Sequence, residues 1–210
     1  MNIKSIITRN TDTLFYLALR YILKDSRSVL DVGCGAHSPI CRVGGRFRST
    51  GIDIFKKSIE ISKKEKNHNE HVIGDIKHLN KYFKDKSFDT VVALDVIEHL
   101  TKKQAIEMVK QMEKIARKSI VIMTPNGFYS QDKLDGNPHQ VHKSGWSKND
   151  FSKMSYRVYG LRGIKFVRGI HATIKYKPWI LWGAIAFITE PILFLFPSLS
   201  YDLLAVKEIN

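Results

Sequence analysis

Residues 29–35 read Val-Leu-Asp-Val-Gly-Cys-Gly, a strand-like run that contains one acid and ends in a Gly-x-Gly turn. Glycine adopts positive φ angles at little cost and lets the backbone approach a ligand closely. In α/β folds, a strand that runs into such a turn and then a helix binds nucleotide-like cofactors at the carboxyl edge of a parallel sheet. Asp31, two residues before Gly33, adds a negative charge beside the turn. This charge suits a ligand with a cationic group better than one with a pyrophosphate.

Around this stretch, apolar periodicity predicts strands that alternate with helices. The predicted strands of this part are 28–32, 49–54, 71–74, 88–94 and 119–124. The predicted helices are 11–24, 37–43, 56–67 and 101–116. Such alternation indicates a mostly parallel sheet with helices on both faces.

The pattern changes after the fifth strand. Residues 126–147 are polar and typical of a loop, and a short helix is expected at 148–156. Two further strands, at 161–170 and 201–207, then complete a seven-stranded sheet whose terminal pair includes one antiparallel strand. The sequence contains no internal repeat, linker or low-complexity tract, so we expect a single domain over 1–210.

Composition narrows the choice of partner and compartment. The formal net charge of +14 favours an anionic partner, with a solvated basic surface as the alternative interpretation. Two cysteines, Cys34 and Cys41, are too few for a disulfide framework and indicate a reducing compartment. The first residues lack the long apolar core of a signal peptide. We therefore expect a cytoplasmic protein.

Four acids stand at or just past the ends of the first four predicted strands: Asp31, Asp53, Asp75 and Asp95. Because the carboxyl ends of parallel strands share one edge of the sheet, these acids are expected to line one crevice. The main competing interpretation is a dinucleotide site, which also uses a Gly-x-Gly turn and a later acid. Ser38 stands where the third glycine of that motif belongs, and Asp31 repels a pyrophosphate.

The order of motifs over residues 28–125 resembles that of the class I S-adenosylmethionine-dependent methyltransferases. The matching segments are residues 29–35, 51–54, 74–76, 88–92 with 95–100, and 142–147. Residues 95–100, Asp-Val-Ile-Glu-His-Leu, are typical of the small-molecule branch related to quinone-biosynthesis methyltransferases. The resemblance implies a Rossmann-like seven-stranded methyltransferase sheet flanked by helices, with S-adenosyl-L-methionine as cofactor.

The resemblance also implies roles for the residues around the glycine turn. Gly33 and Gly35 let the backbone approach the methionine end of the cofactor. Asp31 offsets the ammonium and sulfonium charges, through backbone groups or water. Asp53 accepts hydrogen bonds from both ribose hydroxyls.

On the adenine side, the resemblance assigns Asp75 as acceptor for the amino group, with Ile54 and Ile76 enclosing the ring. Asp95 lies at the same crevice. A turn or helix cap is the alternative interpretation for Asp75 and, less readily, for Asp53.

Methyl transfer depends mainly on holding the acceptor atom in line with the methyl group. A base is needed only if the acceptor loses a proton. The expected catalytic residues are His99, after the fourth strand, and His142, in the loop after the fifth; His139 and Glu98 are further candidates. Each histidine could instead be an ordinary surface residue. His139, His142 and Glu98 could in principle bind a divalent cation, but ligands on separate loops are a weak pattern and no metal site is predicted.

The absence of two motifs guides the choice of acceptor. No Asn-Pro-Pro-Tyr-like sequence follows the fourth strand, and no Pro-Cys nucleophile follows the fourth or fifth, which disfavours adenine, glutamine and cytosine methylation. A small-molecule or lipid-like acceptor is therefore expected. One alternative is a non-catalytic cofactor-fold protein that binds a membrane or a partner. A nucleic-acid methyltransferase is the third interpretation and rests on charge alone.

Residues 179–199 are apolar apart from one formal charge, Glu190. The segment is long enough to span a bilayer, but Pro191 and Pro197 interrupt it and Glu190 is costly at mid-membrane. If the flanking strands are neighbours, both ends of the segment lie on one side, which excludes a single span. We expect an apolar helical insertion at about 178–199, re-entrant or lying on the surface as a helix pair.

Two interpretations remain for this insertion. In the first it contacts an anionic membrane, on the inner face of the cell membrane, as a peripheral anchor. The basic and aromatic residues that favour this contact are Lys165, Arg168, Lys175, Lys177, Trp179 and Trp182. In the second it packs on the domain, covers a pocket or forms a homodimer interface.

Overall fold

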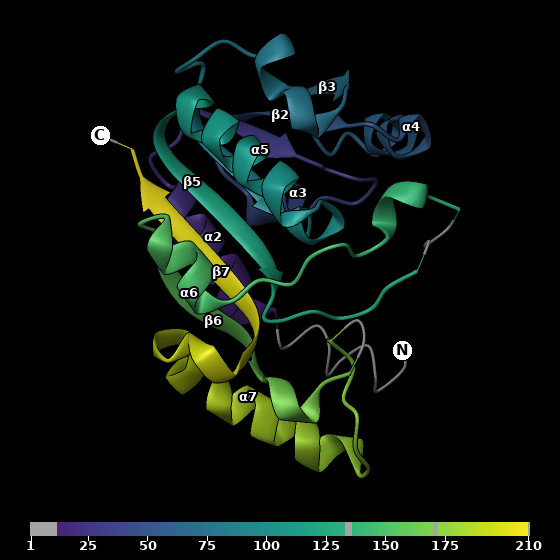
Figure 1. Ribbon diagram of the computed structural model, residues 1–210, viewed down its shortest axis with the longest axis vertical. Coiled ribbons are helices and arrows are strands. Elements are labelled where there is room, and N and C mark those ends of the chain that lie inside the picture. Colours follow the sequence, from purple (N-terminus) through teal and green to yellow (C-terminus); the bar gives the residue numbers. More distant parts are fainter. Residues whose placement is uncertain (1–11, 133–135, 170–171, 210) are drawn as a thin grey trace.

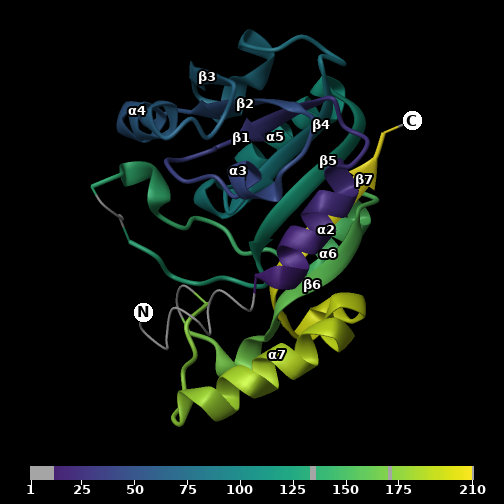
Figure 2. The same ribbon diagram turned by 180° about the vertical axis from the view of Figure 1, so that it is seen from behind.

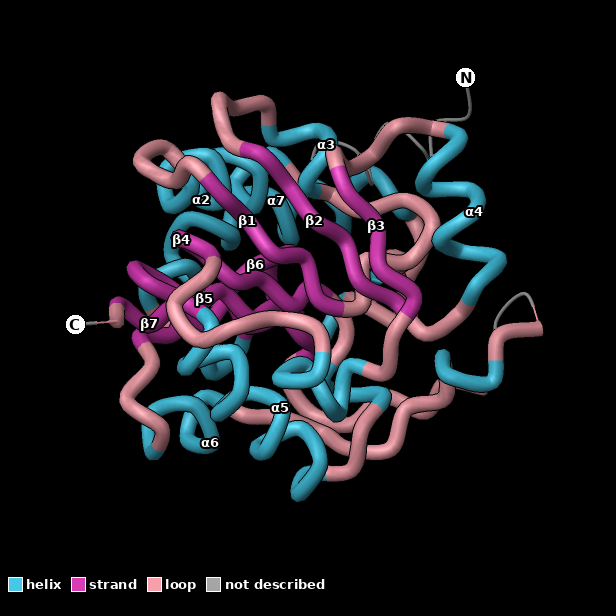
Figure 3. The backbone as a smooth tube through the Cα atoms, turned by 90° about the horizontal axis from the view of Figure 1, so that it is seen from above, coloured by secondary structure: helices cyan, strands magenta, loops and turns pink. Residues whose placement is uncertain are grey.

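The computed structural model describes residues 12–132, 136–169 and 172–209. A seven-stranded sheet with the order β3-β2-β1-β4-β5-β7-β6 forms its centre (Figures 1 and 3). The strands are β1 (Ser28–Val32), β2 (Arg48–Asp53), β3 (Glu70–Ile73), β4 (Phe88–Leu94), β5 (Ala116–Pro125), β6 (Arg157–Ile164) and β7 (Ser200–Glu208). Strands β1 to β5 pair in parallel, and β7 is antiparallel to both β5 and β6. The expected Rossmann-like sheet with one antiparallel strand is confirmed.

Helices cover both faces of this sheet. The helices are α2 (Thr13–Leu23), α3 (Ile40–Val43), α4 (Lys56–Lys64), α5 (Lys102–Ile115), α6 (Lys148–Lys153) and α7 (Trp179–Leu195). Helices α5 and α6 pack on one face, and α2 and α3 on the other, as Figures 1 and 2 show from opposite sides. Short 3-10 turns η1 (Ile76–Lys81) and η2 (Ile97–His99) follow β3 and β4.

Burial on both faces explains the apolar character of the central strand β4. Val91 and Ala93 contribute to the core under α5, whereas Val92 and Leu94 contribute to the core under α2. Such double burial is typical of parallel strands, which are near-continuous apolar runs. Helix α5 begins at a capping box in which the Thr101 side chain accepts from the Gln104 backbone N–H. These packing layers fix the carboxyl ends of the strands, where the site lies.

The structure corrects several expected boundaries: α4 ends at 64 rather than 67, and β5 begins at 116 rather than 119. The helix after the glycine turn covers 40–43 rather than 37–43, and α6 ends at 153 rather than 156. The expected strand at 161–170 lies instead at 157–164. Arg162 and Gly163 adopt positive φ angles of 60° and 68°, and the pairing with β7 shifts register there, so a bulge lies just before the end of the strand at Ile164.

The apolar segment forms one α-helix, α7, rather than the expected helix pair. Pro191 lies inside this helix and does not end it. Glu190 is buried, and its Oε1 accepts a hydrogen bond of 2.8 Å from the Arg162 backbone N–H. Packing on β6 therefore keeps the helix continuous despite Pro191. No helix in the described part of the chain is both long and apolar enough to cross a membrane.

Candidate active site

A cleft opens at the carboxyl ends of β1, β2, β3 and β4. Its cavity volume is about 120 Å³, and it opens broadly to solvent. The residues that line it are Gly33, Asp53, Ile54, Asp75, Ile76, Lys77, Asp95, Val96, His99, Leu100, Gln104, Asn137, His139, Gln140 and Lys143. The convergence expected for the acids at the strand ends is therefore present for Asp53, Asp75 and Asp95.

The glycine turn after β1 lies against β2. Gly33 and Gly35 adopt φ angles of 70° and 57°, which L side chains rarely adopt. The backbone N–H groups of Gly33 and Cys34 both donate to the Ile52 carbonyl, at 2.8 and 3.1 Å. A Cβ atom at Gly33 would lie 2.7 Å from the Val96 side chain, so only glycine fits between the turn and this wall of the cleft.

Asp53, at the end of β2, is held by two backbone groups. Its Oδ2 accepts from the Gly35 N–H at 3.0 Å, and its Oδ1 accepts from the Phe55 N–H at 2.8 Å. Each carboxylate oxygen keeps a second lone pair. Burial raises the pKa of Asp53. The carboxylate thus lies at the cleft in a fixed orientation, with acceptor capacity for two hydroxyl groups.

Asp75 lines the cleft and also caps the 3-10 turn η1. Its Oδ1 accepts from the Lys77 backbone N–H at 3.0 Å, and its Oδ2 lies 3.1 Å from the Lys77 Nζ. Burial alone raises the pKa of a carboxyl, but the hydrogen bonds from Lys77 outweigh burial and lower the pKa of Asp75. The helix-cap interpretation therefore holds, and the adenine-binding role stays a prediction.

Asp31 is not among the cleft-lining residues. Its side chain is buried behind the glycine turn, where it accepts from the Ser38 hydroxyl and lies 2.9 Å from the His68 Nε2. Asp31 thus fastens the turn to the segment before β3, and its expected effect on the cofactor's charge stays a prediction. The sequence carried no signal for His68, because this contact depends on how distant elements pack.

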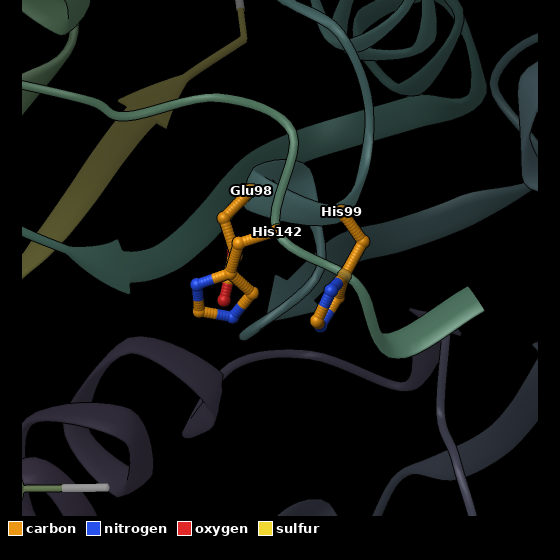
Figure 4. A group of neighbouring side chains, drawn as sticks. All are labelled: Glu98, His99 and His142. Carbon is orange, nitrogen blue, oxygen red and sulfur yellow. The ribbon is translucent and has the colours of Figure 1, made fainter. Parts of the chain in front are cut away.

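Three further side chains gather between η2 and the loop that follows β5. Figure 4 shows Glu98, His99 and His142 near one another. Each offers one ligand atom, and these atoms all lie within 4.8 Å of one another. The centroids of the two imidazole rings are 4.9 Å apart. His99 lines the cleft, whereas His142 is not among the lining residues. Burial and the neighbouring His142 lower the pKa of His99 to about 4, so its ring is neutral at pH 7.

The loop after β5 forms one wall of the cleft. The backbone N–H groups of Lys143 and Ser144 donate to the Glu98 carbonyl at 2.7 and 3.1 Å, which attaches the loop to η2. This wall includes His139, an expected further candidate. The cleft residues that sequence reasoning missed are Lys77, Val96, Leu100, Gln104, Asn137, Gln140 and Lys143. The only sequence signal for any of them was the polar loop expected after the fifth strand, which contains Asn137, Gln140 and Lys143.

Comparisons with known proteins agree with this geometry. Residues 30–127 match the family model described as a methyltransferase domain. This segment, just under half of the chain, is a methyltransferase domain. The family match does not define a branch, so the likeness to quinone-biosynthesis methyltransferases stays a prediction.

Similar proteins share the fold of this methyltransferase. An S-adenosylmethionine-dependent methyltransferase of Archaeoglobus fulgidus is 21% identical, with 93% of each chain covered and a TM-score of 0.59. The magnesium protoporphyrin IX methyltransferase of Synechocystis PCC 6803 is 14% identical over 100% of this chain and 85% of its own, with a TM-score of 0.57. An uncharacterized protein of Methanocaldococcus jannaschii is 24% identical over 196 residues, 91% of this chain and 83% of its own.

The residues of the cleft fit S-adenosylmethionine, which supplies a methyl group on a sulfonium. Gly33 leaves the backbone bare beside Val96, where a larger residue would fill the space. Asp53 retains acceptor capacity for two ribose hydroxyls. Ile54 and Ile76 both line the cleft, where an aromatic base needs apolar contact. The cofactor-binding roles expected of these residues stay predictions.

Proposed function

We propose that this methyltransferase acts on a small-molecule or lipid-like acceptor that enters the cleft beside His99. The observation that carries this proposal is that His99 and Gly33 line the same cleft. The acceptor would therefore lie between the methionine end of the cofactor and the loop after β5. Because the His99 ring is neutral at pH 7, it can accept a hydrogen bond from a hydroxyl acceptor and orient that hydroxyl toward the methyl group.

A transfer assay with labelled cofactor tests this proposal. The purified chain is incubated with labelled S-adenosylmethionine and a cell extract, and labelled products are identified by mass spectrometry. We expect label in a small or lipid-like molecule, and a large loss of transfer in His99→Ala with S-adenosylhomocysteine binding retained. His78→Ala is the matched control, because His78 is an exposed histidine outside the cleft lining.

Two outcomes would contradict the proposal and favour an alternative. Label confined to RNA or DNA would favour nucleic-acid modification, to which the net charge of +14 is suited. Cofactor binding without any transfer would favour a non-catalytic protein of this fold.

The second part of the proposal is that α7 rests on an anionic membrane surface, on the cytoplasmic side. Its outward side chains are large and apolar: Trp179, Ile180, Leu181, Phe187, Ile188, Ile192 and Leu195 are all exposed. Lys175 and Lys177 are exposed just before the helix, and the Lys177 Nζ lies 5.3 Å from the Trp179 ring centroid. Such a combination suits the headgroup region of a bilayer. Arg168, expected to take part, is buried instead and donates to the Ala172 carbonyl.

Vesicle co-sedimentation tests the membrane contact. We expect the chain to sediment with vesicles that contain anionic lipid and to remain in solution with neutral ones. Ile188→Glu should abolish sedimentation, because it places a charge on the most exposed part of α7. Leu17→Glu is the matched control, since Leu17 is an exposed apolar residue on α2. Equal recovery in solution with and without anionic vesicles would favour a homodimer interface or packing role for α7.

A further inference from the structure

The group Glu98, His99 and His142 has the composition of a metal site. It brings together one carboxylate and two imidazoles from two separate segments, η2 and the loop after β5. Imidazole and carboxylate ligands are those that bind Zn²⁺ and similar divalent transition metals. Glu98 and His99 are adjacent in the sequence, whereas His142 is distant and comes close to them only in the folded chain.

Backbone carbonyls orient both imidazole rings. The His142 Nδ1 lies 2.7 Å from the Tyr129 carbonyl, and the His99 Nδ1 lies 3.4 Å from the Val141 carbonyl. A carbonyl accepts, so each Nδ1 carries the hydrogen and each Nε2 presents a lone pair. Metal-binding histidines are held in the same way, with one ring nitrogen on the metal and the other donating to a carbonyl or carboxylate.

The carboxylate is held as well. Glu98 is buried, with 3% of the residue exposed, and its Oε2 accepts from the Thr124 hydroxyl at 2.9 Å. A buried carboxylate is stable as an anion only beside compensating partners. A cation between Glu98 and the two rings would add such a partner.

The spacing suits such an ion. Tetrahedral Zn²⁺ with bonds of 2.0–2.1 Å needs about 3.3 Å between ligand atoms. Because the three ligand atoms already lie within 4.8 Å of one another, each side chain has to move by less than about 1 Å. The backbone contacts of Lys143 and Ser144 with the Glu98 carbonyl hold the two segments together.

We propose that Glu98, His99 and His142 bind one divalent transition-metal ion at the edge of the cleft. His99 lines the cleft, so the fourth coordination position of the ion is open to it. A catalytic metal site has the same form, with three protein ligands and one position for water or substrate. With the ion bound, the His99 lone pair is on the metal and no longer contacts the acceptor directly. An acceptor whose oxygen occupies the open position would then have its hydroxyl pKa lowered by the ion. This part of the inference rests on the proposed function, whereas metal binding itself does not.

Titration of the full chain with Co²⁺, after treatment with a chelator, tests the inference without an activity assay. The readouts are the visible absorption bands of Co²⁺ and the metal content of the desalted protein. We expect one equivalent to bind. His142→Ala and Glu98→Gln should each weaken binding by about 100-fold, and His78→Ala should bind as the unmodified chain does.

S-adenosylhomocysteine binding, measured on each variant, shows that the variant is folded. His99→Gln is the second variant to be used if His142→Ala does not fold. The inference is overturned if the unmodified chain binds no Co²⁺, or if the folded variants bind it as tightly as the unmodified chain. Binding of Co²⁺ without methyl transfer would leave the metal site in place and contradict the proposed function instead.

Discussion

Asp53 connects the glycine turn to the ligand-binding wall, because one carboxylate accepts from Gly35 and from Phe55 while facing the cleft. We expect Asp53→Asn to weaken S-adenosylhomocysteine binding by about 10- to 100-fold, since a hydrogen bond to a charged group contributes roughly 1.5–3 kcal/mol. Isothermal titration calorimetry measures the change. Asp85→Asn, an exposed acid outside the cleft, is the control. Unchanged affinity in Asp53→Asn would mean that the ribose is bound elsewhere.

The buried position of Asp53 also predicts how cofactor affinity depends on pH. Burial raises its pKa above the ordinary value of 3.8. The ionised carboxylate is the better acceptor for hydroxyl groups, so affinity is full above the raised pKa and falls as the pH drops through it. In the unmodified chain, the loss should therefore begin at a higher pH than an ordinary aspartate would give. Asp53→Asn should remove this dependence, and a persisting dependence would assign it to another group.

Residues at strand ends could be predicted from the sequence, whereas residues held by long-range contacts could not. Parallel topology alone brings Gly33, Asp53 and Asp75 to one edge. In contrast, the burial of Asp31 depends on Ser38 and His68, which reach it only after the chain has folded. His99 and His142 were expected near the acceptor, but their contact with each other follows from the path of the loop after β5.

At the scale of elements, α7 is attached to the sheet through two glycines of β6. A Cβ atom at Gly160 would lie 2.2 Å from the Leu193 carbonyl oxygen, and one at Gly163 would lie 2.2 Å from the Ala186 carbonyl oxygen. Bare backbone is therefore what lets the helix approach so closely. The buried side of α7 consists of Gly183, Ala186, Glu190 and Leu193, which leaves its larger apolar side chains outward.

We expect Gly160→Ala to lower the free energy of unfolding by about 1–3 kcal/mol, because overpacking forces backbone shifts of this cost. Thermal or urea unfolding followed by circular dichroism measures the change. Gly169→Ala is the control, since a Cβ atom there meets only ordinary contacts at 3.7 Å. Equal stability of the two variants would show that α7 does not depend on this close approach.

The element boundaries show where sequence patterns fail to predict the structure. The central strands were predicted closely, because each is an apolar run between polar turns. Strand β6 was displaced in the prediction, since its pairing with β7 and the hydrogen bond from the Arg162 backbone N–H to Glu190 join segments that are distant in the sequence. Pro191 was expected to break a helix that packing on β6 keeps continuous.

At the scale of the whole molecule, one sheet contributes to both apolar cores. Strands β1, β4, β5 and β7 place residues in the core under α5 and in the core under α2. Neither core can open without exposing the other. We therefore expect a single cooperative unfolding transition, with equal calorimetric and van't Hoff enthalpies. Two separate transitions in differential scanning calorimetry would contradict the prediction of a single domain.

The crystal structure of the chain with S-adenosylhomocysteine tests the central claim most directly. That claim is that the ends of β1, β2 and β3 bind the nucleoside and amino-acid parts of the cofactor. We predict the ribose hydroxyls within hydrogen-bond distance of Asp53, the adenine ring between Ile54 and Ile76, and the amino-acid end over Gly33. A ligand bound outside this cleft, or a ribose turned away from Asp53, would contradict the account.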